Sequence, residues 1–202
     1  MNPSTALLNP LRLRLPPAAA LDDAGFYSLC RSNPDYRIER AANGEIEIMP
    51  PTGAETGHKN LDLTTDLNIW ARTDGDGVAF DSSTGFTLPN GAIRSPDAAW
   101  VRRDRLAALS AEQKRGFLPL APDFVIELLS PTDSLRVIQA KMEEYRENGV
   151  RLGWMICPDE RCVLIYAEDE SVQRLDDPES LAADPVLPGF RLDLGPIWAP
   201  GF

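Results

Sequence analysis

Two carboxylates and one lysine stand out as residues that can together carry hydrolytic chemistry. Asp97 opens the apolar stretch DAAWV directly after Ser95-Pro96, Glu127 lies in the middle of PDFVIELLSP, and Lys141 follows in KMEEY. Carboxylate oxygens are the ligands that Mg²⁺ prefers, and the ion needs few of them because it keeps several waters. Bound Mg²⁺ lowers the pKa of a coordinated water, and a lysine can orient that water or stabilise a phosphate. These three residues therefore indicate a metal-assisted hydrolytic site.

The stretch around Glu127 predicts an unusual environment for its carboxylate. PDFVIELLSP is a short apolar run closed by proline at both ends, which is typical of a strand buried on both faces of a sheet. Carboxylates are almost never fully buried unless they are paired or bind a metal. Strand alternation puts Glu127 on one face with Val125 and Leu129. The alternative is a structural acid paired with an arginine such as Arg94 or Arg146.

Lys141 belongs to a predicted helix over residues 134–148. The apolar stripe of this helix consists of Leu135, Ile138, Met142 and Tyr145. At about 100° per residue, Lys141 lies about 80° from the centre of the stripe and therefore flanks the buried face. Its stem can run along the sheet toward Glu127. The alternative is an ordinary solvated lysine paired with a neighbour such as Glu144.

The other predicted elements must position these residues. They are an edge strand (11–15), a short helix capped by Asp22, a hairpin (36–49) around Asn43-Gly44, a helix with Leu63, Leu67 and Trp70 on one face, strands over 77–101, a hairpin in LGWMICPDERCVLIYAED and a final strand in VLPGFRLDLGPIW. Thr52 followed by Glu55 matches a capping box at the start of the longer helix. This order predicts an α/β (α+β-like) sandwich on one central mixed sheet flanked by helices, with additional β-hairpins, and not an alternating dinucleotide-binding fold.

The chain length and composition predict one domain over 1–202. We divide it into an N-terminal strand and helix extension (1–35), a core (roughly 36–170) and a C-terminal acidic segment with a strand (171–202). The net charge of −11 argues against phosphate binding. The argument is weaker for most of the chain, because residues 158–193 hold ten acids and three arginines.

The cysteine usage and the apolar segments bear on location. The three cysteines, Cys30, Cys157 and Cys162, are too few for a disulfide framework and favour a reducing cytoplasm. No stretch approaches the roughly 18–20 apolar residues of a membrane span, and the N-terminus lacks the features of an export signal. We therefore expect a cytoplasmic protein that does not enter membranes.

Several motifs taken together resemble a known family. SPDAAWV, then PDFVIELLSP and KMEEY, are similar to the Uma family of restriction-endonuclease-like proteins, within the PD-(D/E)XK nuclease superfamily. NGEIEIMPPTG, His58, FDSSTGFTLPNG, GVRLGWMICP and VLPGF follow the family order, so the resemblance covers nearly the whole chain. It implies a restriction-endonuclease-like core and Mg²⁺-dependent (or Mn²⁺-dependent) cleavage of phosphodiester bonds in DNA.

The resemblance also implies roles for individual residues. Asp97 and Glu127 would bind the metal, with the carbonyl of Leu128 as a third ligand, and Lys141 would position the attacking water. The chain departs from the superfamily pattern because Leu129, and not a lysine, stands two residues after Glu127. The lysine is therefore expected from the following helix.

The superfamily often adds an acid from a helix near the start of the core. Glu55 is the matching candidate here, with His58 about one turn later. The alternatives are a capping box for Glu55 and a helix-surface or core position for His58. Asp97 in turn can simply end a turn after Pro96.

Two other functions remain open at the level of the sequence. One is a nuclease-fold domain that has lost efficient cleavage, which the negative charge favours. The other is a dimeric binding protein, because Trp198 and Phe202 in the apolar terminus GPIWAPGF can dock on a second subunit. The sequence does not predict the substrate sequence, a choice of DNA over RNA, or a biological role.

Overall fold

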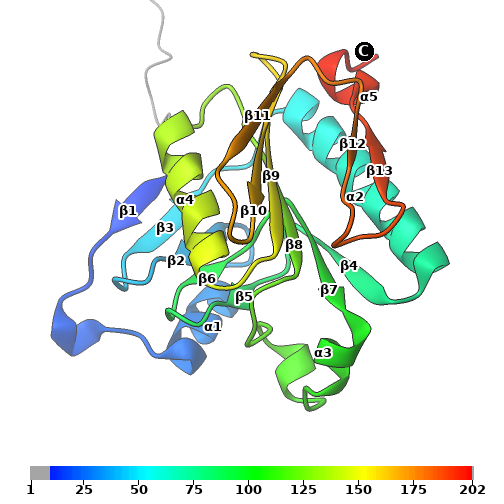
Figure 1. Cartoon of the computed structure of the whole chain (residues 1–202). Helices are drawn as coiled ribbons and strands as arrows, with labels where there is room; N and C mark the ends of the chain where they lie inside the picture. Colours follow the sequence, from blue (N-terminus) through cyan, green and yellow to red (C-terminus); the bar gives the residue numbers. More distant parts are fainter. Residues whose placement is uncertain (1–9, 202) are drawn as a thin grey trace, which may run out of the picture.

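A six-stranded mixed sheet forms the centre of the molecule in the computed structural model, which describes residues 10–201. Its strands are β4 (Gly77–Asp81), β7 (Ala98–Arg102), β8 (Phe124–Leu128), β9 (Leu152–Cys157), β10 (Cys162–Ala167) and β11 (Gln173–Asp176). They are arranged in the order β11-β10-β9-β8-β7-β4 (Figure 1). Only the pair β8–β9 is parallel, and the other neighbours run antiparallel. The central mixed sheet predicted from the sequence is confirmed.

The parallel pair requires a crossover, and a helix provides it. Helix α4 (Leu135–Glu147) connects β8 to β9, as parallel neighbours generally require. All five residues of β8 are buried, because this strand has a neighbour on each edge and a packed layer on each face. The predicted strand around Glu127 and the predicted helix after it are therefore both present.

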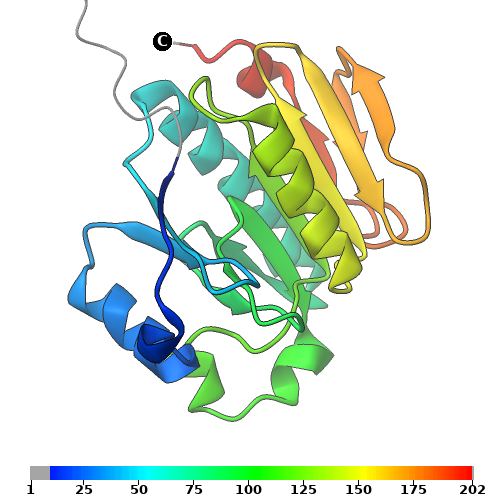
Figure 2. The same ribbon diagram turned by 90° about the vertical axis from the view of Figure 1, so that its left-hand side faces the viewer.

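Each face of the central sheet is covered by one long helix (Figures 1 and 2). Helix α2 (Ala54–Asp74) packs Leu63 and Leu67 on the face that carries Phe124 and Ile126. Helix α4 packs on the opposite face, where its buried residues meet Val125. Side chains alternate between faces along a strand. Glu127 therefore shares the face of Val125 and points toward α4, as the alternation predicts.

A second, five-stranded antiparallel sheet lies beside the first. It contains β1 (Leu11–Leu13), β2 (Arg37–Arg40), β3 (Ile46–Met49), β5 (Phe86–Thr87) and β6 (Ile93–Arg94), in the order β1-β3-β2-β6-β5. Helix α1 (Asp23–Ser32) packs on it through Phe26, which forms a small core with Ile38, Ile46 and Ile93. The side chain of Asp22 accepts a hydrogen bond from the Gly25 amide and caps α1. The edge strand, the short helix and the hairpin at Asn43-Gly44 are all confirmed.

The C-terminal residues extend the layer on the α2 side. Strands β12 (Ser180–Ala182) and β13 (Arg191–Asp193) form a two-stranded sheet, and α5 (Gly195–Trp198) follows it. Leu181, Leu192 and Ile197 from these elements join the core beneath α2. The remaining short elements are η1 (Pro17–Ala19), α3 (Arg103–Ala107) and η2 (Gln113–Arg115). Between residues 10 and 201, no helix combines the length and the apolar character needed to cross a membrane.

Candidate active site

Asp97 and Glu127 lie next to one another on neighbouring strands. In the antiparallel pair β7–β8, Ala98 is opposite Ile126, so one further step along the register brings Asp97 opposite Glu127. Side chains that are directly opposite in this way have Cβ atoms about 5 Å apart. Asp97 also accepts a hydrogen bond from the Leu128 amide through Oδ2, at 2.9 Å. Both carboxylates are buried, with 7% of Asp97 and 3% of Glu127 exposed.

Lys141 reaches this pair from α4. Its Nζ lies 2.8 Å from Oε1 of Glu127, so the contact predicted from helical geometry is present. Tyr145, one turn further along α4, donates its hydroxyl to the same oxygen at 2.8 Å. The partner predicted for a purely structural Glu127 was Arg94 or Arg146, and neither contacts it. Instead, Arg146 pairs with Glu143 on its own helix.

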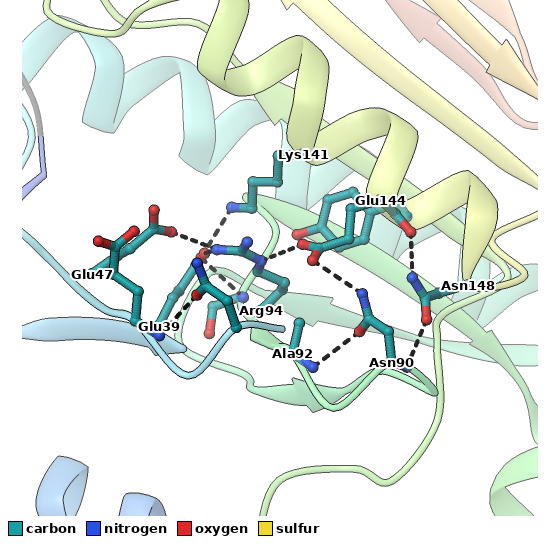
Figure 3. A network of polar contacts seen from close by, with 12 residues as sticks. Glu39, Glu47, Asn90, Ala92, Arg94, Lys141, Glu144 and Asn148 are labelled. Atoms are coloured by element: carbon teal, nitrogen blue, oxygen red, sulfur yellow. Dashed lines mark hydrogen bonds and ion pairs between the residues drawn. The ribbon is translucent and has the colours of Figure 1, made fainter. Parts of the chain in front are cut away.

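A third carboxylate, which the sequence did not single out, completes the surroundings of Lys141. Glu39 of β2 is 1% exposed and its Oε1 accepts from Lys141 Nζ at 3.0 Å. The same oxygen accepts from the Ser95 amide at 3.1 Å, two residues before Asp97. Figure 3 shows the side chain of Lys141 extending from α4 toward Glu39. Glu39 thus connects the second sheet to both the lysine and the segment that carries Asp97.

Two arginines balance these acids. Arg94 is almost fully enclosed and contacts Glu39 at 3.2 Å, Glu47 at 2.5 Å and Glu144 at 2.6 Å (Figure 3). Arg37, at the start of β2, lies 3.0 Å from Oδ1 of Asp97 through its Nη1. These arginines come from the second sheet, while the carboxylates they neutralise come from both sheets and α4.

Burial and charge shift the acids in opposite directions. The pKa of Glu127 is raised to about 7, because burial and the charges of Asp97 and Glu39, which raise it, outweigh Lys141 and Arg37, which lower it. For Glu39, burial also acts to raise the pKa, but Lys141, Arg94 and Arg37 outweigh it and bring the pKa to about 2. The pKa of Lys141 is raised, because Glu127 and Glu39 outweigh the effect of its burial. Two carboxylates of one buried cluster therefore differ in basicity, as is common where proton transfer takes place.

The donor set fits a divalent ion bound by few protein ligands. Among the described residues, no three or more His, Cys, Asp or Glu side chains are gathered as a ready-made metal cage. Mg²⁺, however, is usually bound through one or two carboxylates and keeps several waters. Asp97 and Glu127 supply two hard oxygen donors side by side, and their mutual repulsion is what a divalent cation would offset. Asp97, Glu127 and the backbone at Leu128 are therefore suited to Mg²⁺ or Mn²⁺.

Comparison with known proteins gives the family of the chain. The family model described as "Uma2: Putative restriction endonuclease" matches residues 23–195. The chain belongs to the Uma2 family. The match includes Asp97, Glu127, Lys141 and also Glu39, so every residue of the buried cluster lies within the Uma2 region. No curated protein matched the sequence.

A solved structure shows the same fold as this Uma2 chain. It is described as a "putative nuclease belonging to DUF820" from Anabaena variabilis ATCC 29413, and it superposes with a TM-score of 0.72. The two sequences are 21% identical, and the likeness covers 88% of this chain and 97% of the other. The restriction-endonuclease-like fold expected from the sequence is thus confirmed.

Glu55 and His58 of this Uma2 chain lie on α2, and each lies close to a residue one turn further along the same helix. Helix α2 begins at Ala54 with Gly53 as its N-cap and without a side-chain cap, so the predicted capping box is wrong. Glu55 pairs with Lys59 at 2.6 Å. His58 Nε2 lies 3.8 Å from Asp62. A site role for Glu55 or His58 remains a prediction.

Proposed function

We propose that this chain is a Mg²⁺-dependent or Mn²⁺-dependent nuclease that hydrolyses phosphodiester bonds in DNA. The contact of 2.8 Å between Lys141 and Glu127, beside Asp97, carries this proposal. Lys141 thus brings to Glu127, from helix α4, the lysine that the superfamily usually places two residues after the glutamate. Membership of the family described as "Uma2: Putative restriction endonuclease" supports the same chemistry.

Each residue of the cluster has a role in this proposal. Asp97 and Glu127 hold the ion, with the Leu128 carbonyl as a third ligand. When bound, the ion supplies an activated water and neutralises charge on the phosphate. Lys141 directs its N–H groups at the water that attacks phosphorus, and its charge favours the transition state. Glu55 or His58 would assist from the first long helix.

Glu39 and Tyr145 position the reactive groups. Glu39 holds the lysine from the side opposite Glu127, so that the Lys141 ammonium is fixed between two carboxylates. The hydroxyl of Tyr145 fixes one oxygen of Glu127. Neither residue contacts the substrate in this proposal.

A metal-binding measurement with a cleavage assay tests the proposal. Calorimetric titration with Ca²⁺ or Mn²⁺ should show binding to the wild type, and Glu127→Gln should weaken it at least tenfold. Plasmid and single-stranded DNA should be cut with Mg²⁺ or Mn²⁺, and Asp97→Ala should abolish cutting. Glu143→Gln is a suitable control, because Glu143 pairs with Arg146 on its own helix and is partly exposed. Equal metal binding by wild type and Glu127→Gln would disprove the assignment.

A second candidate is a nuclease-fold domain without efficient cleavage that acts as a dimeric binding protein. The net charge of −11 favours it, because DNA binding depends on neutralising phosphates. Trp198, proposed as a dimer contact, donates its indole N–H to the Pro178 carbonyl at 2.9 Å within its own chain. Phe202 lies outside the described residues. Sedimentation at several protein concentrations tests dimerisation, and metal-dependent DNA cutting lost in Asp97→Ala excludes the inactive domain.

A further inference from the structure

We propose that Arg37 is the phosphate-binding residue of this site, and that it competes with the metal ion for Asp97. In the metal-free protein the guanidinium neutralises Asp97. With the ion at Asp97, the same guanidinium contacts the substrate phosphate. The inference rests on the proposed nuclease function and adds to it the group that recognises the substrate.

The contact between Arg37 and Asp97 occupies a metal-binding position. Nη1 of Arg37 lies 3.0 Å from Oδ1 of Asp97, and Oδ2 of the same carboxylate accepts the Leu128 amide. Both oxygens are therefore engaged before a metal arrives. The hydrogen bond from the Leu128 amide is fixed by the backbone of β8, whereas Arg37 binds Asp97 through a side chain that can move. Each carboxylate oxygen keeps a second lone pair for a metal, so a cation competes with Arg37 through charge repulsion, and Arg37 is the partner that can move away.

Arg37 is also the most accessible cation of the cluster. Its side chain is 31% exposed, compared with 9% for Arg94 and 10% for Lys141. Arg94 contacts three carboxylates and Lys141 contacts two. Arg37 also has internal partners, Asp97 at 3.0 Å and Glu39 at 3.7 Å. Its greater exposure, however, lets a solvent-borne phosphate reach it without opening the core.

The hydrogen bonds of Arg37 are incomplete. Its Nη1 donates to Asp97 and its Nη2 donates to the Ser95 carbonyl. Its Nε is buried and has no hydrogen-bond partner in the described part of the chain. A buried N–H without a partner costs stability. A guanidinium presents its donors as a planar fork that matches the oxygens of a phosphate, so once the guanidinium has left Asp97 a phosphate would satisfy donors, Nε included, that its present position leaves unpaired.

The charges of the cluster make the exchange favourable. The two acids proposed to bind the metal, Asp97 and Glu127, carry two negative charges when ionised, and their direct partners Arg37 and Lys141 carry two positive ones. A divalent ion at Asp97 therefore leaves two positive charges in excess, and a phosphodiester offsets one of them. Arg37 is the cation best placed to follow that phosphate, because its existing bond to Asp97 is the one that the metal weakens.

Opposite effects on metal and DNA binding test this inference. In the absence of DNA, Arg37→Gln should bind Ca²⁺ about tenfold more tightly than the wild type, because a competing positive charge is removed. With Ca²⁺ present, the same variant should bind a short DNA duplex about tenfold more weakly. A residue with only a structural role would lower both affinities together. Calorimetry measures the first affinity and fluorescence anisotropy the second.

Arg12→Gln is the matched control. Arg12 pairs with Glu47 at 3.0 Å on β1, at the outer edge of the same sheet, and does not contact Asp97. The Arg12→Gln substitution removes the same charge as Arg37→Gln, but from a more exposed position, where charges are screened. The affinities for Ca²⁺ and for the duplex should therefore stay within about twofold of wild type. Unchanged Ca²⁺ affinity in Arg37→Gln, or an unchanged duplex affinity, would overturn the inference.

Arg37→Lys keeps the inference testable if the glutamine variant does not fold. Lysine retains the charge and loses the fork. We expect Ca²⁺ affinity near wild type and duplex affinity lowered at least threefold; duplex affinity equal to wild type would contradict the inference. Failure of the proposed function is a separate result: the wild type then binds no Ca²⁺ and cuts no DNA. If the wild type does both and the Arg37 variants match it, only the present inference fails.

Discussion

At the scale of single residues, Glu127 is the group whose ionisation the fold opposes. Burial raises its pKa from the usual 4.5 to about 7, and Asp97 and Glu39 act in the same direction. Between these two pH values the native state binds more protons than the unfolded state. Stability from this group is therefore fully present below about pH 4.5 and is lost as the pH rises through 7.

The metal-free protein should consequently lose thermal stability as the pH is raised from 5 to 8. Glu127→Gln has no carboxyl group to ionise, so its melting temperature should change less over the same range. Differential scanning calorimetry in the presence of a chelator measures both slopes. Identical slopes for the two proteins would show that Glu127 titrates normally in the fold.

The same property gives metal binding a pH dependence. Metal binding needs the ionised carboxylate, so affinity for Ca²⁺ should increase as the pH rises through 7. Tyr145→Phe removes the donor to Oε1 of Glu127. Hydrogen bonding to the ionised form favours it, so the midpoint of this increase should move to higher pH in the variant. Tyr166→Phe, also a buried tyrosine on the α4 side of the sheet, should leave the midpoint unchanged.

At the scale of elements, the surroundings of two glycines predict opposite effects of an alanine substitution on stability. Gly77 opens β4, and a Cβ atom there would collide with the indole ring of Trp100 on the neighbouring strand β7. Gly57 lies inside α2, where a Cβ would meet only the Thr52 methyl group, at 3.7 Å. The indole is rigid and buried, whereas the surroundings of Gly57 are open.

Gly77→Ala should therefore destabilise the protein by about 2 kcal/mol or more, as overpacking does. Gly57→Ala should stabilise it by about 0.5–1 kcal/mol, because alanine is the better helix former. Urea denaturation of both variants measures the two changes. Changes of the same sign would contradict the packing of β4 on β7.

Elements with strong local patterns could be predicted from the sequence, and so could the part of the site that they carry. The apolar run PDFVIELLSP gave the strand and the facing of Glu127. The helical angle of Lys141 gave its approach. Both predictions depend on short stretches of chain, where periodicity determines which side chains share a face.

The contribution of the hairpin could not be predicted in the same way. A two-residue loop at Asn43-Gly44 would place Glu39 opposite Ile48, but the observed register places it opposite Glu47. Two acids directly opposite each other repel, and Arg94 compensates them from a strand far along the sequence. Because of this one-residue difference in register, the sequence predicted neither the pair of Glu39 with Glu47 nor the arginine that neutralises it.

At the scale of the whole molecule, buried ion pairs link the two sheets and α4. Glu39 belongs to the second sheet, Lys141 to α4, and Ser95 to the segment that leads into β7. Removing one partner of a buried ion pair leaves an uncompensated charge. The relative placement of the two sheets therefore depends on Glu39 as well as on apolar packing.

Glu39→Gln should lower the free energy of unfolding by about 3 kcal/mol or more. Glu143→Gln, which breaks a partly exposed pair with Arg146, should cost less than about 1 kcal/mol. Chemical denaturation at pH 7 compares the two. A small effect of Glu39→Gln would mean that apolar contacts alone hold the sheets together.

Two backbone amides donate hydrogen bonds to carboxylates of the cluster. The Leu128 N–H donates to Asp97 at 2.9 Å and the Ser95 N–H donates to Glu39 at 3.1 Å. The resonance of an amide proton depends on the charge of its acceptor. In isotope-labelled protein, the Leu128 signal should therefore report on Asp97 and the Ser95 signal on Glu39. The chain thus contains two nuclear magnetic resonance probes, which report on two acids of one buried cluster separately without any substitution.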